Sequence, residues 1–134
     1  MKIIALCALL AAVPGAAAGE EPAPTDTAVS FREDVFPLVK KYCLPCHAED
    51  NANPSDLHLD TYKSLKAGGR KGPGIVPGKP SESMFLQKMG EKPPFGGRMP
   101  LHSKRKIKEG KVRWLTPEEM DLLARWIRQG AKDN

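Results

Sequence analysis

The feature that most constrains this chain of 134 residues is the pentapeptide Cys43-Leu44-Pro45-Cys46-His47. It holds two thiols that are two residues apart, and an imidazole follows the second thiol directly. The chain has one further cysteine, Cys7, in an apolar stretch at its start. A fold for this chain therefore has to give a role to two thiols and an imidazole that lie within one short segment.

The Cys-x-x-Cys-His spacing is typical of the covalent attachment of haem c. Two thiols at this separation can add to the two vinyl groups of one porphyrin, and the adjacent imidazole can then give a nitrogen to the iron. The sequence therefore predicts one haem c group, attached through Cys43 and Cys46, with His47 as an iron ligand.

Three other interpretations of the pentapeptide compete with haem. A structural zinc site needs four ligands, and the other histidines, His58 and His102, would make a scattered set. A thiol–disulfide pair of the thioredoxin kind needs a buried strand just upstream, whereas the residues before Cys43 have a helical pattern. A plain disulfide leaves His47 without a role. The thiol–disulfide pair is the main alternative to haem.

The first nineteen residues, 1–19, predict a secretory signal peptide. A lysine is followed by an apolar run and then by small residues, with cleavage expected after Ala18 or Gly19. The apolar run is shorter than the about 20 residues of a membrane span, so we expect an exported, periplasmic protein without a span. Residues 20–29 are acidic and proline-rich, which predicts a flexible leader, and residues 30–134 are expected to form one folded domain.

Helix signals dominate the predicted domain, which we therefore assign to the all-α class. Ser30 and Glu33 have capping-box spacing ahead of apolar residues that run into Cys43, and Pro37 predicts a late start or a kink. Thr116-Pro117 begins an amphipathic stretch that Gly130 ends. Shorter helices are expected over 61–67 and 81–89, and a small hairpin over 107–112. With six per cent aromatic residues and thirteen prolines, a coiled coil, a repeat array or a multi-domain enzyme is excluded.

An all-α domain whose first helix runs into the attachment sequence, and whose last helix is amphipathic, resembles a small class I cytochrome c. More narrowly, residues 31–130 resemble the planctomycete-type cytochrome c domain. The segments that carry this resemblance, besides the pentapeptide, are Val35-Phe36-Pro37-Leu38, Leu57-His58-Leu59-Asp60-Thr61, 72–83, Arg98-Met99-Pro100, Leu115-Thr116 and 126–131.

A second axial ligand for the iron is expected on the opposite face of the ring. The candidates are His58, His102, Met84, Met89, Met99 and Met120. Met99 lies in a segment rich in proline and glycine, which stiffens a loop and lets its backbone pass close to a flat ring. The resemblance also implies Met99 as the axial methionine. His102, three residues further on, is the second choice. In class I cytochromes a Gly-Pro turn offers its proline carbonyl to the proximal histidine, and Gly72-Pro73 resembles that turn.

Charge is unevenly distributed along the predicted mature chain. Residues 20–60 hold three basic and nine acidic residues, whereas residues 61–134 hold seventeen basic and seven acidic ones. The segment 102–113 is especially basic, which predicts either a solvated insertion or a docking surface for an acidic redox partner beside Met99. No aromatic stacking pattern or groove-reading motif indicates that the chain binds nucleic acid. The expected oligomeric state is a monomer.

These features together predict a diffusible electron carrier rather than an enzyme. A thioether ligand favours Fe(II) over Fe(III), and two filled axial positions leave no site for a small molecule. The alternatives are a haem peroxidase in which Met99 dissociates, a ligand-sensing haem module, a subunit of a larger redox complex, or a thiol–disulfide protein without haem.

Overall fold

The computed structural model describes residues 27–134. Its helices, in chain order, are η1 (Phe31–Val35), α1 (Phe36–Tyr42), α2 (Tyr62–Ala67), η2 (Pro80–Glu82), α3 (Met84–Gln87), α4 (Lys104–Lys108) and α5 (Pro117–Arg128). Over residues 27–134 no β-strand is present, which agrees with the expected all-α class. No helix within this range is long and apolar enough to cross a membrane. The predicted signal peptide and most of the predicted leader lie outside the described residues.

The first helical segment begins where the capping pattern predicts. The Ser30 hydroxyl accepts from the Glu33 amide at 3.2 Å. The reciprocal bond of the capping pattern comes from Asp34, whose carboxylate accepts from the Ser30 amide at 2.8 Å. The first turn, η1, is a wide π-type turn, and Pro37 then lies in the first turn of α1. A proline has no N–H and its ring clashes with the carbonyl four residues back, so a wide turn before Pro37 relieves both problems.

Two further predicted helices begin at threonine caps, of which the one at Thr116 was predicted. Thr61 caps α2 through a reciprocal pair of hydrogen bonds with Ser64, and Gly68 ends the helix at a φ of 77°. Thr116 caps α5 through the same arrangement with Glu119, and Gly130, at a φ of 101°, follows its end. Since the caps satisfy amide groups that would otherwise have no partner, the two helix starts are fixed by local sequence.

The predicted hairpin at 107–112 is wrong, because this segment contains the end of helix α4. Ser103 caps the helix by accepting from the Lys106 amide at 3.3 Å, and Arg105 pairs with Glu109 at 3.1 Å along the helix. Gly110, at a φ of 67°, ends it, and the Lys111 amide then donates to the Lys106 carbonyl at 2.9 Å. This is the glycine-terminated helix end known as a Schellman motif, and it uses the Glu-Gly pair that suggested a hairpin turn.

The predicted helix over 81–89 is also divided. Ser83 separates η2 from α3, and its side chain is fully buried. The Ser83 hydroxyl lies 2.9 Å from the Val76 amide, from which it accepts, and 2.9 Å from the Lys79 carbonyl, to which it donates. The serine therefore satisfies the backbone of the preceding loop instead of continuing one helix.

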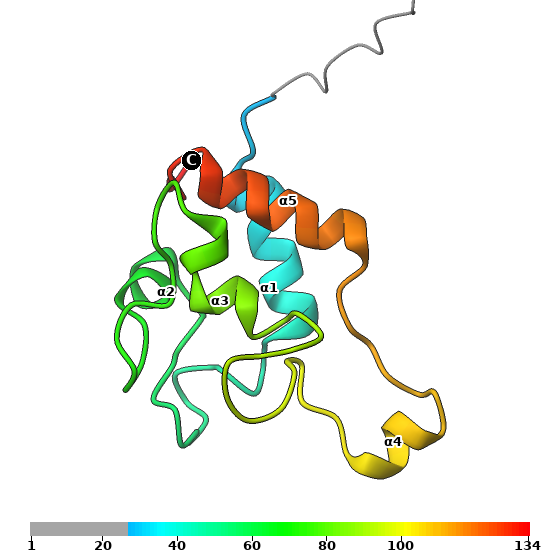
Figure 1. Ribbon diagram of the computed structural model, residues 1–134. Helices are drawn as coiled ribbons and strands as arrows, with labels where there is room; N and C mark the ends of the chain where they lie inside the picture. The colour runs from blue at the N-terminus through cyan, green and yellow to red at the C-terminus, as the bar shows by residue number, and fades with distance from the viewer. Residues whose placement is uncertain (1–26) are drawn as a thin grey trace, which may run out of the picture.

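Helix α5 crosses η1 and α1, and the core lies at this crossing (Figure 1). Trp126 is the largest fully buried side chain, and its ring centroid lies 5.6 Å from that of Phe31. Phe31 in turn meets Tyr62 of α2 edge-on at 5.1 Å. The Trp126 indole N–H donates to the Lys132 carbonyl at 2.9 Å, so its burial leaves no polar group unsatisfied.

A polar link ties the end of α1 to the start of α5. The carboxylate of Glu119 accepts from the Tyr42 hydroxyl at 2.7 Å and pairs with the Lys41 ammonium at 2.8 Å. Burial alone would raise the pKa of Glu119, but the hydrogen bonds from Lys41, the Thr116 amide and Tyr42 outweigh it and hold that pKa below its ordinary value of 4.5. The link holds the helix that leads into Cys43 against α5.

We expect Glu119→Gln to lower the free energy of unfolding by about 1 kcal/mol at neutral pH, because it removes the charge from this link. The pKa of Glu119 is depressed in the folded state, so its contribution is present above about pH 4.5 and is lost as the pH falls through the folded-state value. Urea unfolding of both proteins between pH 7 and pH 3 tests this. Asp121→Asn, which breaks an exposed pair with Arg125, is the control and should change stability little. A gap between wild type and Glu119→Gln that is equal at both pH values would contradict the prediction.

Candidate haem attachment site

The pentapeptide forms a turn directly after α1, and its Leu44–Pro45 peptide bond is cis. The Cys43 amide donates to the Val39 carbonyl at 2.8 Å, which continues the helix by one residue. The His47 amide then donates to the Cys43 carbonyl at 3.1 Å, and the Ala48 amide to that of Pro45 at 3.0 Å. The two thiols and the imidazole are therefore held within one hydrogen-bonded turn of the backbone.

The two thiols differ in their surroundings. Cys43 is half-buried against the core and Cys46 is exposed, and neither forms a disulfide. Burial raises the pKa of the Cys43 thiol to about 12. A dithiol redox site needs an attacking thiolate, and its pKa is lowered in such proteins. The environment of Cys43 therefore makes this thiol, but not the exposed Cys46, a poor attacking group.

The imidazole of His47 is held through one of its two ring nitrogens. Its Nδ1 lies 2.9 Å from the Leu57 carbonyl oxygen, and since a carbonyl can only accept, Nδ1 carries the proton. The lone pair is then on Nε2, the atom that would bind iron. A histidine ligand usually has this kind of partner, which fixes its tautomer and its ring orientation.

The carbonyl beside His47 differs from the one that the resemblance implied. We expected Pro73 to accept from the ring, but Leu57 does so in this structure. The chain returns to His47 early, because the Leu59 amide donates to the His47 carbonyl at 2.8 Å. The Gly72-Pro73 turn instead lies against Gly68, where a side chain would overlap the Gly72 carbonyl.

A narrow apolar gap lies beside Cys43, between α1, α3 and α5, and has no room for a water molecule. It is lined by Leu38, Val39, Tyr42, Cys43, Phe85, Met89, Leu115 and Leu123. Pockets that enclose a whole ligand measure roughly 300–1,000 Å³, so this gap could meet only the edge of a large ring. The lining suits an apolar ring edge joined to the Cys43 sulfur.

Met99 lies in a loop that is held on both sides. Its amide donates to the Lys88 carbonyl at 2.8 Å, and the Arg98 side chain donates to the Met89 carbonyl at 2.9 Å. The Arg98 guanidinium also lies 4.4 Å from the centre of the Trp114 ring. The Met99 side chain is partly buried and packs against the same core cluster as Cys43 and Leu44.

The two other histidines are engaged elsewhere. The ring nitrogens of His58 lie 3.3 Å from the Ala48 carbonyl and 3.4 Å from an Asp56 carboxylate oxygen. The Nε2 of His102 accepts from the Arg113 amide at 3.1 Å. Within residues 27–134 no three His, Cys, Asp or Glu side chains gather as a metal site, so the zinc interpretation has no support there.

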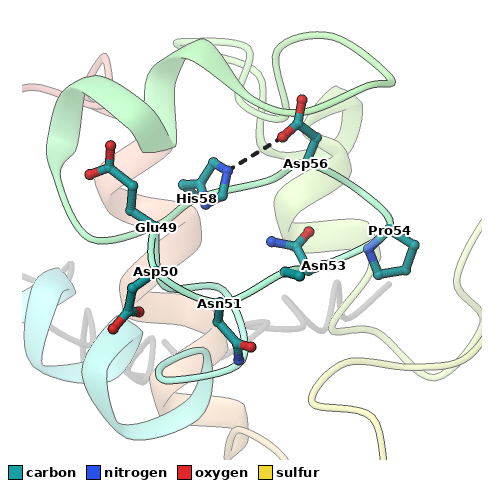
Figure 2. Close-up of a pocket in the computed structure, with 8 residues that line it drawn as sticks. Glu49, Asp50, Asn51, Asn53, Pro54, Asp56 and His58 are labelled. Atoms are coloured by element: carbon teal, nitrogen blue, oxygen red, sulfur yellow. Dashed lines mark ion pairs between the residues drawn. The ribbon is translucent and has the colours of Figure 1, made fainter.

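An open hollow lies on the loop that follows the pentapeptide, between Glu49 and His58. Figure 2 shows the side chains of Glu49, Asp50 and Asn51 pointing away from the loop, whereas His58 turns towards Asp56. The acidic groups therefore face solvent instead of converging on a shared centre. We assign no ligand to this hollow.

Comparison with known families favours the haem interpretation of the pentapeptide. Residues 43–100 match the family model described as planctomycete cytochrome c. The match confirms the predicted resemblance over the segment that runs from the first thiol to the Met99-Pro100 pair. No protein with a curated description and no solved structure matches the chain. The match therefore indicates a haem c protein of electron transfer over this segment.

The donors of this segment fit the group that the matched family implies. Two free thiols and an imidazole with Nε2 available lie within one turn of the chain, and an apolar gap adjoins one thiol. The role of the Leu57 carbonyl was not predictable from the sequence, since nothing in an apolar residue type marks its backbone oxygen as a partner for His47.

Proposed function

We propose that this chain is an exported monohaem c-type cytochrome that carries single electrons, with a class I fold. Thioether bonds from Cys43 and Cys46 would hold the haem, and His47 and Met99 would be its axial ligands. The observation that carries the proposal is the His47 ring, which is oriented by the Leu57 carbonyl beside two free thiols in a segment that matches a cytochrome c family. When bound, the haem iron would supply the one-electron couple.

The chain would contribute rigid positioning. The η1–α1 segment fixes the thiols through α5 and the core, and the Leu57 carbonyl fixes the His47 ring. The backbone bonds to Lys88 and Met89 fix the Met99 loop. Ligands that keep one geometry in both oxidation states lower the reorganisation that electron transfer requires.

The spectrum of the holoprotein tests this proposal against an enzyme or a ligand sensor. The protein is produced together with the cytochrome c maturation machinery, and its visible spectrum is recorded before and after reduction under CO. A carrier should show a low-spin ferric spectrum with a methionine charge-transfer band and no change under CO. Rapid binding of CO or peroxide would favour the peroxidase or the sensor instead.

We also propose a docking surface for an acidic redox partner. It is formed by residues 101–113, which we call the basic arm. Helix α4 lies within it, apart from the other helices (Figure 1), and has no buried residue. Leu101 and Ile107 are exposed large apolar side chains among its lysines and arginines. The two ends of the arm are joined by a hydrogen bond from the Arg113 amide to Nε2 of His102. Exposed positive charge with apolar residues in its midst suits an electrostatically steered, short-lived complex.

We expect the double variant Lys104→Gln, Lys106→Gln to slow oxidation of the reduced protein by anionic ferricyanide roughly tenfold at low ionic strength. The dependence of the rate on salt should also flatten. Arg105 is kept because its pair with Glu109 supports the helix. The matched control is Lys63→Gln, Lys66→Gln on α2, which removes the same charge away from the arm. Equal slowing in both double variants would show that net charge, and not this arm, steers the reagent.

A further inference from the structure

The loop that supplies the Leu57 carbonyl is closed by the side chain of Asn53. From Glu49 to Asp56, Asn53 is the one residue that is half-buried, and its neighbours on both sides are exposed. Figure 2 shows its side chain directed into the loop, while Asn51 points outwards. A polar side chain that is withdrawn from solvent in this way normally has hydrogen-bond partners inside the loop.

Those contacts are to the peptide groups of Leu57. The Asn53 Oδ1 atom accepts from the Leu57 amide at 3.2 Å, and its Nδ2 donates to the Leu57 carbonyl at 3.3 Å. The Ser55 hydroxyl donates to the same Oδ1 at 2.6 Å, and the Asp56 amide donates to the Asn53 carbonyl at 3.2 Å. One side chain therefore holds both polar groups of the residue on which His47 depends.

We infer that Asn53 is a positioning residue for the iron ligand His47. It holds the Leu57 peptide so that its carbonyl faces Nδ1 of the ring, at 2.9 Å. A carbonyl that accepts from Nδ1 makes the imidazole a stronger donor through Nε2, and a stronger donor favours Fe(III). Through this chain of contacts Asn53 would lower the reduction potential of the bound haem. The inference rests on the proposed function.

Loss of the Asn53 side chain should free the Leu57 peptide and weaken its bond with His47. In the Asn53→Ala holoprotein we expect the equilibrium with a redox mediator to move towards Fe(II) by about three- to tenfold, the effect of one hydrogen bond. In the reduced protein, the Nδ1 proton of His47, followed by NMR, should exchange with solvent faster by a similar factor. A purely structural role would lower stability and leave both quantities unchanged.

Two further variants make the test specific. Asn51→Ala removes the same residue type from the same loop, where it donates to the Pro45 carbonyl at 3.2 Å, and should leave both quantities as in the wild type. Asn53→Asp keeps the oxygen that accepts from Leu57 and Ser55 but loses the donor to the Leu57 carbonyl, so its ring-proton exchange should fall between those of the wild type and Asn53→Ala. It also provides the comparison if Asn53→Ala does not fold.

The outcomes separate this inference from the function on which it rests. A wild-type protein that takes up no haem overturns the proposed function. A wild-type protein with haem attached, together with an Asn53→Ala variant of unchanged mediator equilibrium and unchanged ring-proton exchange, overturns the role of Asn53 alone.

Discussion

Replacing Met99 with leucine is expected to convert the protein from a closed electron carrier into a ligand-binding haem protein. Leucine removes the thioether at nearly constant volume, so the loop should keep its packing. The ferric spectrum should lose its methionine charge-transfer band, and the reduced protein should bind CO. The reduction potential should fall by on the order of 0.1–0.2 V, a fraction of the about 0.8 V that axial ligands span, because the lost sulfur favours Fe(II).

Met89→Leu is the matched control for this prediction. Met89 is the buried methionine that lines the gap beside Cys43, so it is the nearest rival on structural grounds. Its replacement should leave the band, the potential and the resistance to CO unchanged. If Met89→Leu opened the iron to CO while Met99→Leu did not, the assignment of Met99 as the axial ligand would be wrong.

The second large effect should come from Trp126, the side chain at the crossing of α5 with η1. Trp126→Ala is expected to lower the free energy of unfolding by about 3–5 kcal/mol, because it leaves a cavity against Phe31 and removes the partner of the Lys132 carbonyl. Denaturant unfolding followed by circular dichroism measures the loss. A small domain has only about 5–15 kcal/mol of stability, so the variant should be marginal.

Trp114, the other tryptophan, is the control for this loss. It is half-buried, packs against Arg98 and donates to the Pro100 carbonyl at 3.3 Å. Trp114→Ala should cost about 1 kcal/mol and act mainly on the Met99 loop. Equal destabilisation by the two variants would show that the crossing of α5 with η1 is not the centre of the core.

Those parts of the fold that depend on local chemistry were predictable from the sequence. Thr61 with Gly68, and Thr116 with Gly130, mark helix ends by capping and by backbone conformation, and the structure confirms both helices. The segment 107–112 was predicted wrongly because a Glu-Gly pair is compatible with a hairpin turn and with a helix end. The serine cap at Ser103 and the pairing of Arg105 with Glu109 favour the helix.

The site was predictable to the extent that its chemistry resides in side chains. Cys43, Cys46 and His47 follow from their spacing, and the family match covers all three. The partner of the His47 ring was not predictable, because a backbone carbonyl carries no residue type and its position depends on how the loop returns. Asn53 was hidden for the same reason: among the polar residues from 49 to 56, only the structure shows which one turns inward.

The most direct test of the whole account is the mass of the purified protein, made with the maturation machinery present, together with the mass of its proteolytic peptides. We expect the added mass of one haem on the peptide that contains Cys43 and Cys46, and loss of that addition in the double variant Cys43→Ala, Cys46→Ala. A colourless protein whose mass equals that of the bare polypeptide would contradict the account and would return the pentapeptide to the thiol–disulfide interpretation.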